Sequence, residues 1–183
     1  MPEEKKIKIE GENFPVVELP KEEVEDLKCL LRLVPPHKKV SREVTEKDID
    51  RIIEESKVLH EICFKPSGIY KGAYAMHHSQ IDAKDPMNLF VTWDRQIVIN
   101  VKITNHSNYT VDSMEACMSF PTRPQIKVPR WQKIEVEFVT IMVDPENKEK
   151  FKLSGVQKLK LSGHQAWIFQ HEIDHGNAQF IFQ

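Results

Sequence analysis

The pattern H-E-x-x-H near the end of the chain constrains the fold more than any other segment. Its histidines, His171 and His175, are four residues apart, so an α-helix places them on one face, one turn apart. Two imidazoles at this spacing can bind one divalent metal ion, and Glu172 can exchange a proton with a water on that ion. The alternative is that these polar side chains simply cover an exposed helix face. We expect this helix to begin near Ser162, which would cap it, and to end near Gly176 as a left-handed C-terminal residue.

A catalytic metal site needs a third protein ligand and an open position. Spacing alone does not choose that ligand, and an isolated cysteine is usually a small buried hydrophobic residue. The candidates, besides many carboxylates, are Cys117, His106, His164, His77 and His78.

Hydrophobic periodicity predicts helices at both ends of a strand-rich middle. Helical spacing runs through Lys21 to Val34, and a second helix is predicted from about Glu46 to about Cys63, capped by Thr45 and Asp48. Alternating or β-branched runs then predict strands near 89–93, 96–104, 134–138 and 151–161, with a turn at 144–147. The fold class is therefore α+β: a mainly antiparallel sheet around a C-terminal H-E-x-x-H helix, with one N-terminal helix.

Length and charge limit the organisation and the partners. A chain of 183 residues suits one domain, and we expect an N-terminal arm at 1–20 and a single catalytic domain at 21–183. Lys and Arg number 26 against 28 Asp and Glu, which argues against nucleic-acid binding by bulk charge. We expect no membrane span, because no apolar run is long enough. Three scattered cysteines without a signal segment predict a reducing, cytoplasmic location.

Three segments carry a resemblance to the peptide deformylase family. Residues 170–175 (Gln-His-Glu-Ile-Asp-His) are similar to its motif Q-H-E-x-D-H, and residues 115–119 (Glu-Ala-Cys-Met-Ser) to E-G-C-L-S. Upstream, residues 75–80 (Ala-Met-His-His-Ser-Gln) resemble the first motif, G-L-A-A-x-Q. The motifs occur in the family's order, and the likeness spans about residues 30–182.

This resemblance implies a role for individual residues. Cys117, His171 and His175 match the metal ligands, and Glu172 matches the general acid and base. Gln80 and the backbone N–H of Met118 match the groups that stabilise the oxyanion. Ala75 and Arg130 match positions at the substrate groove.

The resemblance also implies a reaction and a cofactor. The enzyme would hydrolyse the N-formyl group from N-formylmethionyl nascent peptides at the ribosome, releasing formate, and would act as a monomer. One divalent metal ion activates the attacking water in this family. Fe2+ is expected natively, and Zn2+, Ni2+ or Co2+ can substitute in preparations.

Several residues depart from the family pattern and keep alternatives open. Ala73 and Ala75 replace two glycines, and Gly176 replaces a leucine. His77 and His78 replace two small alanines, and we expect them at the rim or the surface of a shifted loop. The alternatives are an H-E-x-x-H metallopeptidase with a different third ligand, and a non-catalytic relative that keeps the metal or binds peptide N-termini.

Overall fold

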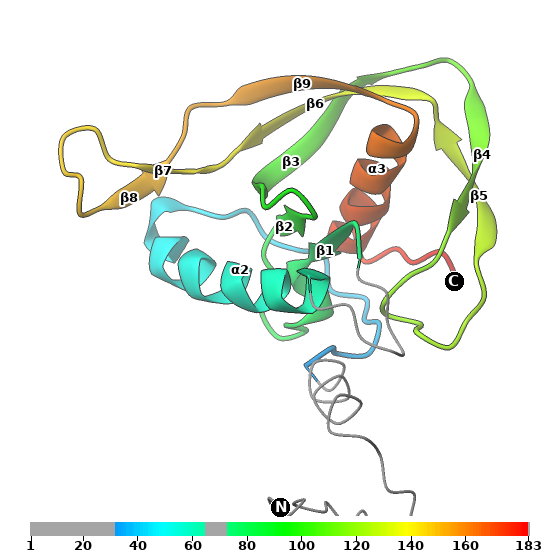
Figure 1. The fold of residues 1–183 in the computed structure, drawn as a ribbon, viewed down its shortest axis with the longest axis horizontal. Coiled ribbons are helices and arrows are strands. Elements are labelled where there is room, and N and C mark those ends of the chain that lie inside the picture. Colours follow the sequence, from blue (N-terminus) through cyan, green and yellow to red (C-terminus); the bar gives the residue numbers. More distant parts are fainter. Residues whose placement is uncertain (1–31, 65–72, 183) are drawn as a thin grey trace, which may run out of the picture.

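The computed structural model describes residues 32–64 and 73–182 as an α+β fold. Figure 1 shows long, curved strands along one side of the molecule and two α-helices beside them. The helices are η1 (Glu46–Asp48), α2 (Ile49–Phe64), η2 (His78–Gln80) and α3 (His164–Gly176), where η denotes a 3-10 helix. The strands are β1 (Ala75–His77), β2 (Leu89–Thr92), β3 (Ile97–His106), β4 (Thr110–Glu115), β5 (Ile126–Trp131), β6 (Lys133–Val139), β7 (Ile141–Val143), β8 (Phe151–Leu153) and β9 (Gln157–Ser162).

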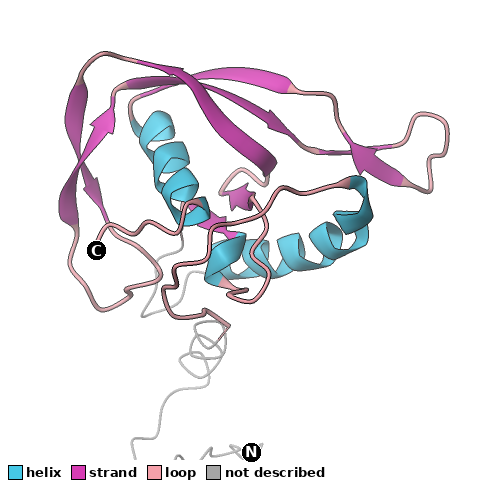
Figure 2. Cartoon of the chain, turned by 180° about the vertical axis from the view of Figure 1, so that it is seen from behind, coloured by secondary structure: helices cyan, strands magenta, loops and turns pink. Residues whose placement is uncertain are grey.

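The main sheet is antiparallel throughout and has the order β1-β2-β3-β6-β9. Two further antiparallel pairs, β4-β5 and β7-β8, extend from it on opposite sides (Figures 1 and 2). The fold class that we predicted from the sequence is therefore confirmed.

Strand β2 explains how the two helices are placed. All four of its residues are buried, because helices cover both faces of the sheet here. Leu89 and Val91 point into a core cluster with Ile52 and Leu59 of α2. Phe90 points the other way, into a cluster with Phe169 of α3, and the two rings meet edge to face at 5.1 Å. The alternation of a strand thus fixes α3 against one face and α2 against the other.

Most sequence-based boundaries agree with the structure. The helix predicted from about Glu46 to about Cys63 is observed as η1 followed by α2, and the Asp48 carboxylate accepts the Thr45 backbone N–H at 2.8 Å. Ile134, Val136 and Phe138 are buried in alternation along β6, as the pattern predicts. The arm at 1–20 and most of the Lys21 to Val34 helix lie outside the described residues.

Both predicted ends of the last helix need correction. Ser162 is the last residue of β9, and Gly163 precedes the helix instead, with φ 57° and ψ −136°. This backbone conformation favours a residue without a Cβ. At the other end Gly176 is helical, and the residue with positive φ is Ala178.

The prediction that His77 and His78 lie at the surface is wrong, because both side chains are 0% exposed. The His78 ring lies between the Glu55 carboxylate, bonded to its Nε2, and the Met87 backbone N–H, which donates to its Nδ1 at 3.1 Å. Burial lowers the pKa of both histidines, that of His77 to about 3, so both are neutral.

No helix within the described ranges is long and apolar enough to cross a membrane.

Candidate active site

Three possible metal ligands converge from two elements. Cys117 follows β4. His171 and His175 lie on one face of α3, and this face is turned toward Cys117. The Cys117 Sγ lies 3.3 Å from Nε2 of His175, which lies 3.2 Å from Nε2 of His171. In a tetrahedral site with bonds of about 2.0 Å to nitrogen and about 2.3 Å to sulfur, neighbouring ligand atoms lie about 3.3–3.5 Å apart. The three donors therefore fit one metal ion of the size of zinc or iron.

Glu115 fixes the orientation of the His171 ring. Its Oε2 lies 2.9 Å from Nδ1 of His171, so Nδ1 carries the proton and Nε2 is left free for a metal. Burial raises the pKa of Glu115, but hydrogen bonds from Arg130 and His171 outweigh it and lower the pKa to about 2. A permanently ionised carboxylate behind His171 is the usual support for a histidine ligand.

Arg130 lies behind the site rather than along the cavity. Its guanidinium donates to both Glu115 oxygens, at 2.7 and 2.8 Å, and to Asp174 at 2.5 Å. It is 6% exposed and is absent from the cavity lining. The substrate contact implied by the resemblance stays a prediction, whereas these contacts fit a role in holding Glu115 against α3.

Glu172 is buried beside the metal ligands and reaches the cavity. Its Oε2 has no hydrogen-bond partner in the described part of the chain. Burial raises its pKa to about 7, although the nearby His171 acts in the opposite direction. A carboxyl group with this pKa can both take up and release a proton near neutral pH.

Gln80 presents its amide to the same cavity. The backbone N–H of His77 donates to Oε1 of Gln80 at 2.9 Å, which turns the Nε2 group toward Ser119 Oγ at 3.2 Å. One N–H of that group thus remains for a ligand, because an amide nitrogen has two. Met118 and Ala75 also line the cavity. Neither Ala73 nor Ala75 has positive φ, so the loss of the two family glycines does not strain the backbone.

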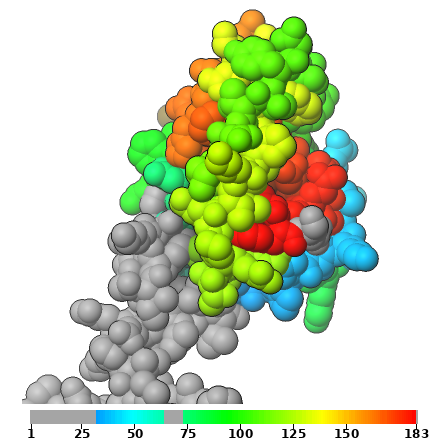
Figure 3. Space-filling model, turned by 90° about the vertical axis from the view of Figure 1, so that its right-hand side faces the viewer, coloured from blue at the N-terminus to red at the C-terminus, as the bar shows by residue number. Residues whose placement is uncertain are grey.

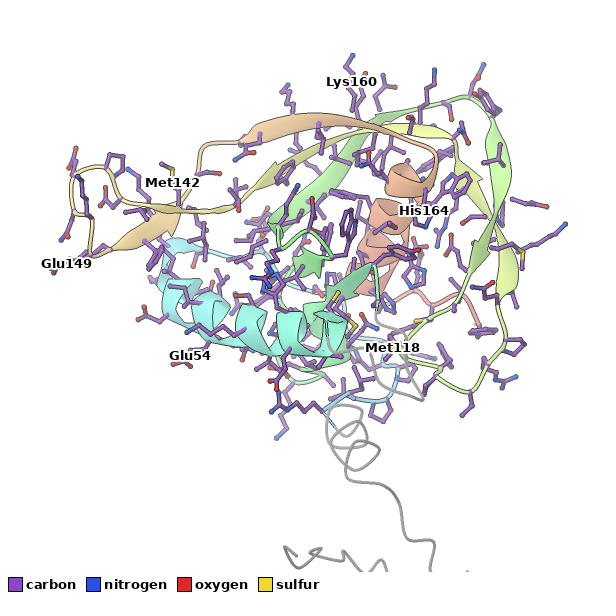
Figure 4. The ribbon with its side chains drawn as sticks, in the orientation of Figure 1. Glu54, Met118, Met142, Glu149, Lys160 and His164 are labelled. Carbon is purple, nitrogen blue, oxygen red and sulfur yellow. The ribbon has the colours of Figure 1, made fainter. Side chains whose placement is uncertain are left out.

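The cavity has a volume of about 380 Å³ and joins the three motif segments. Figure 4 labels Met118 and His164, which line it from the loop after β4 and from the first turn of α3. A second cavity of about 400 Å³, against β3, β6 and β9, is lined by His106, one of the candidate third ligands, and by none of the motif residues.

Several cavity residues were missed by the sequence reasoning, and His164 was considered only as a metal ligand. Two positions could have been found, because 164 and 167 lie on the same helical face as His171. Tyr74, Phe120 and Arg123 come from loops, where no periodic signal exists. The missed residues include Tyr74, Phe120, Arg123 and Trp167.

The C-terminal residues close one side of this region. Phe120 meets the rings of Phe180 and Phe182 edge to face, at 6.1 and 5.1 Å. The space-filling view in Figure 3 shows the red C-terminal segment packed beside a yellow-green segment from the middle of the chain. The loop that carries Cys117 is therefore packed against the C-terminal residues through Phe120.

The fold and the site define a class: an α+β protein whose H-E-x-x-H helix and one cysteine form a candidate three-ligand metal centre. The family model described as polypeptide deformylase matches residues 67–183, which is more than half of the sequence. The chain belongs to the peptide deformylase family.

Two bacterial relatives show the extent of the sequence similarity. Peptide deformylase 2 of Nostoc sp. is 38% identical over 78 residues, which are 43% of this chain and 37% of the relative. Peptide deformylase of Oceanobacillus iheyensis is 33% identical over 118 residues, 63% of this chain and 54% of the relative. The chain thus spans about a third to about half of the length of these relatives.

Solved structures share the fold. The peptide deformylase of Thermus thermophilus is 27% identical, with a TM-score of 0.61, over 79% of this chain and 77% of that chain. The enzyme from Thermotoga maritima is 24% identical, with a TM-score of 0.62, over 79% and 87%. A deformylase from the Vibrio parahaemolyticus bacteriophage VP16T, solved with actinonin, is 22% identical, with a TM-score of 0.59, over 81% and 95%.

Proposed function

We propose that this chain is a peptide deformylase, a metal-dependent hydrolase that removes the N-formyl group from N-formylmethionyl peptides and releases formate. The observation that carries the proposal is the placement of Glu172 beside the Cys117, His171 and His175 donors, at the wall of one cavity. The relatives that share the motifs bear the name peptide deformylase.

The ligand set suggests how the chain would use a metal. Cys117, His171 and His175 would hold one divalent ion, natively Fe2+, which supplies a water activated for attack on the formyl carbon. Zn2+, Ni2+ or Co2+ would replace it in preparations, because imidazole and thiolate bind all of these ions. Thiolate and ferrous iron both oxidise readily, so this site requires the reducing conditions of a cytoplasm.

The residues around the donors divide the remaining work. Glu172 would take the water proton and return it to the leaving amine, which its pKa of about 7 permits. The Gln80 amide and the Met118 backbone N–H would stabilise the oxyanion, at about 3–4 kcal/mol for a donor of this kind. Ala75 would lie along the bound peptide.

The cavity lining fits the substrate class. Met118, Phe120, Trp167 and Ile168 give it apolar walls, which suit an unbranched methionine side chain. The partner would be the N-terminus of a nascent chain at the ribosome, and the protein would act as a monomer in N-terminal processing during protein biosynthesis.

Formate release from formyl-Met-Ala-Ser by anaerobically prepared, iron-loaded protein tests the proposal. Glu172→Gln is the matched control, because it keeps the size and should keep the metal. We expect it to lower kcat by about a thousandfold. Actinonin, which is bound in the phage deformylase structure, should compete with the peptide. Formate release by the parent no faster than by Glu172→Gln would reject the enzyme hypothesis and favour a non-catalytic relative.

Metal analysis separates the deformylase from an H-E-x-x-H metallopeptidase. Cys117→Ala should remove metal from the deformylase site, whereas a peptidase with a different third ligand would keep it. A parent protein that retains less than about 0.1 ion per chain after loading would reject both metal-dependent hypotheses.

A further inference from the structure

The ring of His77 is fully buried next to the site, yet it takes no part in the chemistry proposed above. It is 0% exposed, it does not line the cavity, and it is not one of the metal ligands. Its Nδ1 accepts the backbone N–H of Ser79 at 3.1 Å and thereby caps η2. His77 thus supports Gln80 in two ways: its backbone N–H donates to Oε1 of the Gln80 amide, and its ring caps the short helix that ends at Gln80.

The opposite side of the ring meets the last turn of α3. A Cβ built on Gly176 would lie 3.1 Å from Nε2 of His77, which is closer than about nine in ten real contacts of a Cβ. Gly176 does not have positive φ, so its backbone conformation does not require a glycine. The ring of His77 therefore occupies the space that a side chain at position 176 would need.

Ser79 gives a second link between these elements. Its hydroxyl lies 3.0 Å from Nδ1 of His77 and donates to the carbonyl oxygen of His175 at 3.3 Å. His175 immediately precedes Gly176, so both contacts act on the same turn of α3. Through this turn, the position of η2 is coupled to that of a proposed metal ligand.

We propose that His77 is a positioning residue that fixes the Gln80 amide and the last turn of α3 relative to each other. The inference rests on the proposed function, which assigns roles to Gln80 and His175. An alanine at position 77 can neither accept the Ser79 N–H nor fill the space beside Gly176. The large ring at position 77 and the absent side chain at position 176 therefore fit together. A change at one of these positions should alter the effect of a change at the other.

A double-mutant cycle in the metal-loaded full chain tests the pairing. Gly176→Ala alone brings a Cβ against the ring, so Tm should fall by about 2–4 °C. In the His77→Ala background the space is open, and Gly176→Ala should leave Tm unchanged or raise it, because alanine favours the helix. The same effect of Gly176→Ala in both backgrounds would overturn the pairing.

Kinetics test the positioning role separately. We expect His77→Ala to lower kcat by about tenfold or more and to change KM by less than about threefold, because the displaced donor acts in the transition state. His77→Asn can still accept the Ser79 N–H, so it should recover most of kcat without recovering Tm. Leu59→Ala, a core truncation in α2, controls for lost stability and should keep kcat.

The outcomes distinguish the two proposals. Equal losses of kcat in His77→Ala and Leu59→Ala, or no recovery in His77→Asn, would overturn the positioning role. A parent protein that releases no formate would reject the proposed function instead. The thermal cycle still decides the pairing in that case, because it does not depend on turnover.

Discussion

The two walls of the cavity are held in different ways. We call residues 115–119 together with α3 the metal wall, and residues 75–80 the β1–η2 wall. In the metal wall a buried guanidinium, Arg130, joins Glu115 to Asp174 of the helix. In the β1–η2 wall the histidines are neutral and are held by packing and by hydrogen bonds, His77 through Ser79 and His78 through Glu55 and the Met87 N–H.

This difference follows from what each wall has to do. The metal wall must orient an imidazole toward an ion, and an ionised Glu115 does so through the His171 Nδ1–H. The β1–η2 wall must keep the Gln80 amide in place, which the packing and hydrogen bonds of neutral rings can achieve. We therefore expect the metal wall to be sensitive to loss of charge and the β1–η2 wall to loss of volume.

Removal of the buried cation should have the largest effect. Arg130→Met leaves the Glu115 carboxylate, itself 8% exposed, with only His171 to balance it. We expect the free energy of unfolding to fall by about 3–5 kcal/mol, measured by urea denaturation. Lys127→Met is the control on the same strand, because its 3.8 Å ion pair with Asp112 is exposed and should contribute less than about 1 kcal/mol. Equal losses in the two variants would contradict the importance of charge in the metal wall.

Removal of a buried ring from the β1–η2 wall should have the second largest effect on stability. His78→Ala removes a fully buried ring and its bonds to Glu55 and the Met87 N–H, and we expect a loss of about 2–3 kcal/mol in the same assay. The exposed His106, which stacks on Trp131 at 3.8 Å, is the control, and His106→Ala should cost less than about 1 kcal/mol. A loss in His78→Ala no greater than in this control would show that the ring is not part of the core.

Because of His77, the stability of the parent protein should depend on pH more strongly than that of a variant without this ring. Burial lowers its folded pKa to about 3, whereas a histidine in the unfolded chain titrates near about 6.5. Between these values the unfolded chain binds a proton that the folded chain does not, so stability falls as the pH falls through this window. From pH 7.5 to 5.0 the parent should lose about 2 kcal/mol more than His77→Asn. Parallel pH profiles would mean that His77 is not held neutral.

The metal wall was the easier half to predict. His171 and His175 are one helical turn apart in the sequence, so periodicity alone brings them to one face. Cys117 needed the motif around it, since no spacing rule selects one cysteine as a ligand. The predicted α+β class, with strands alternating as β6 does, followed from the same local periodicities.

The β1–η2 wall could not be predicted because its partners are distant in the sequence. His77 packs against Gly176, and His78 is hydrogen-bonded to Glu55. No local sequence pattern predicts either contact. Two polar residues in a short segment were therefore expected at the surface. Gly176 was interpreted as a left-handed end of the helix, although its lack of a side chain is explained by the ring that packs against it.

The smallest predicted effect concerns the residue that precedes α3, the helix of the metal wall. Gly163 precedes α3 with φ 57° and ψ −136°, a conformation in which a Cβ is strained even though the nearest side-chain atom would be 3.8 Å away. Gly163→Ala should therefore cost about 1–2 kcal/mol in urea denaturation. Gly155→Ala is the matched control, because a Cβ there meets nothing within 4 Å and the φ is ordinary.

Ser162→Ala should be nearly neutral as well, since no side chain caps this helix. A larger loss in Ser162→Ala than in Gly163→Ala would restore the serine cap that the sequence suggested, and would place the start of α3 one residue earlier.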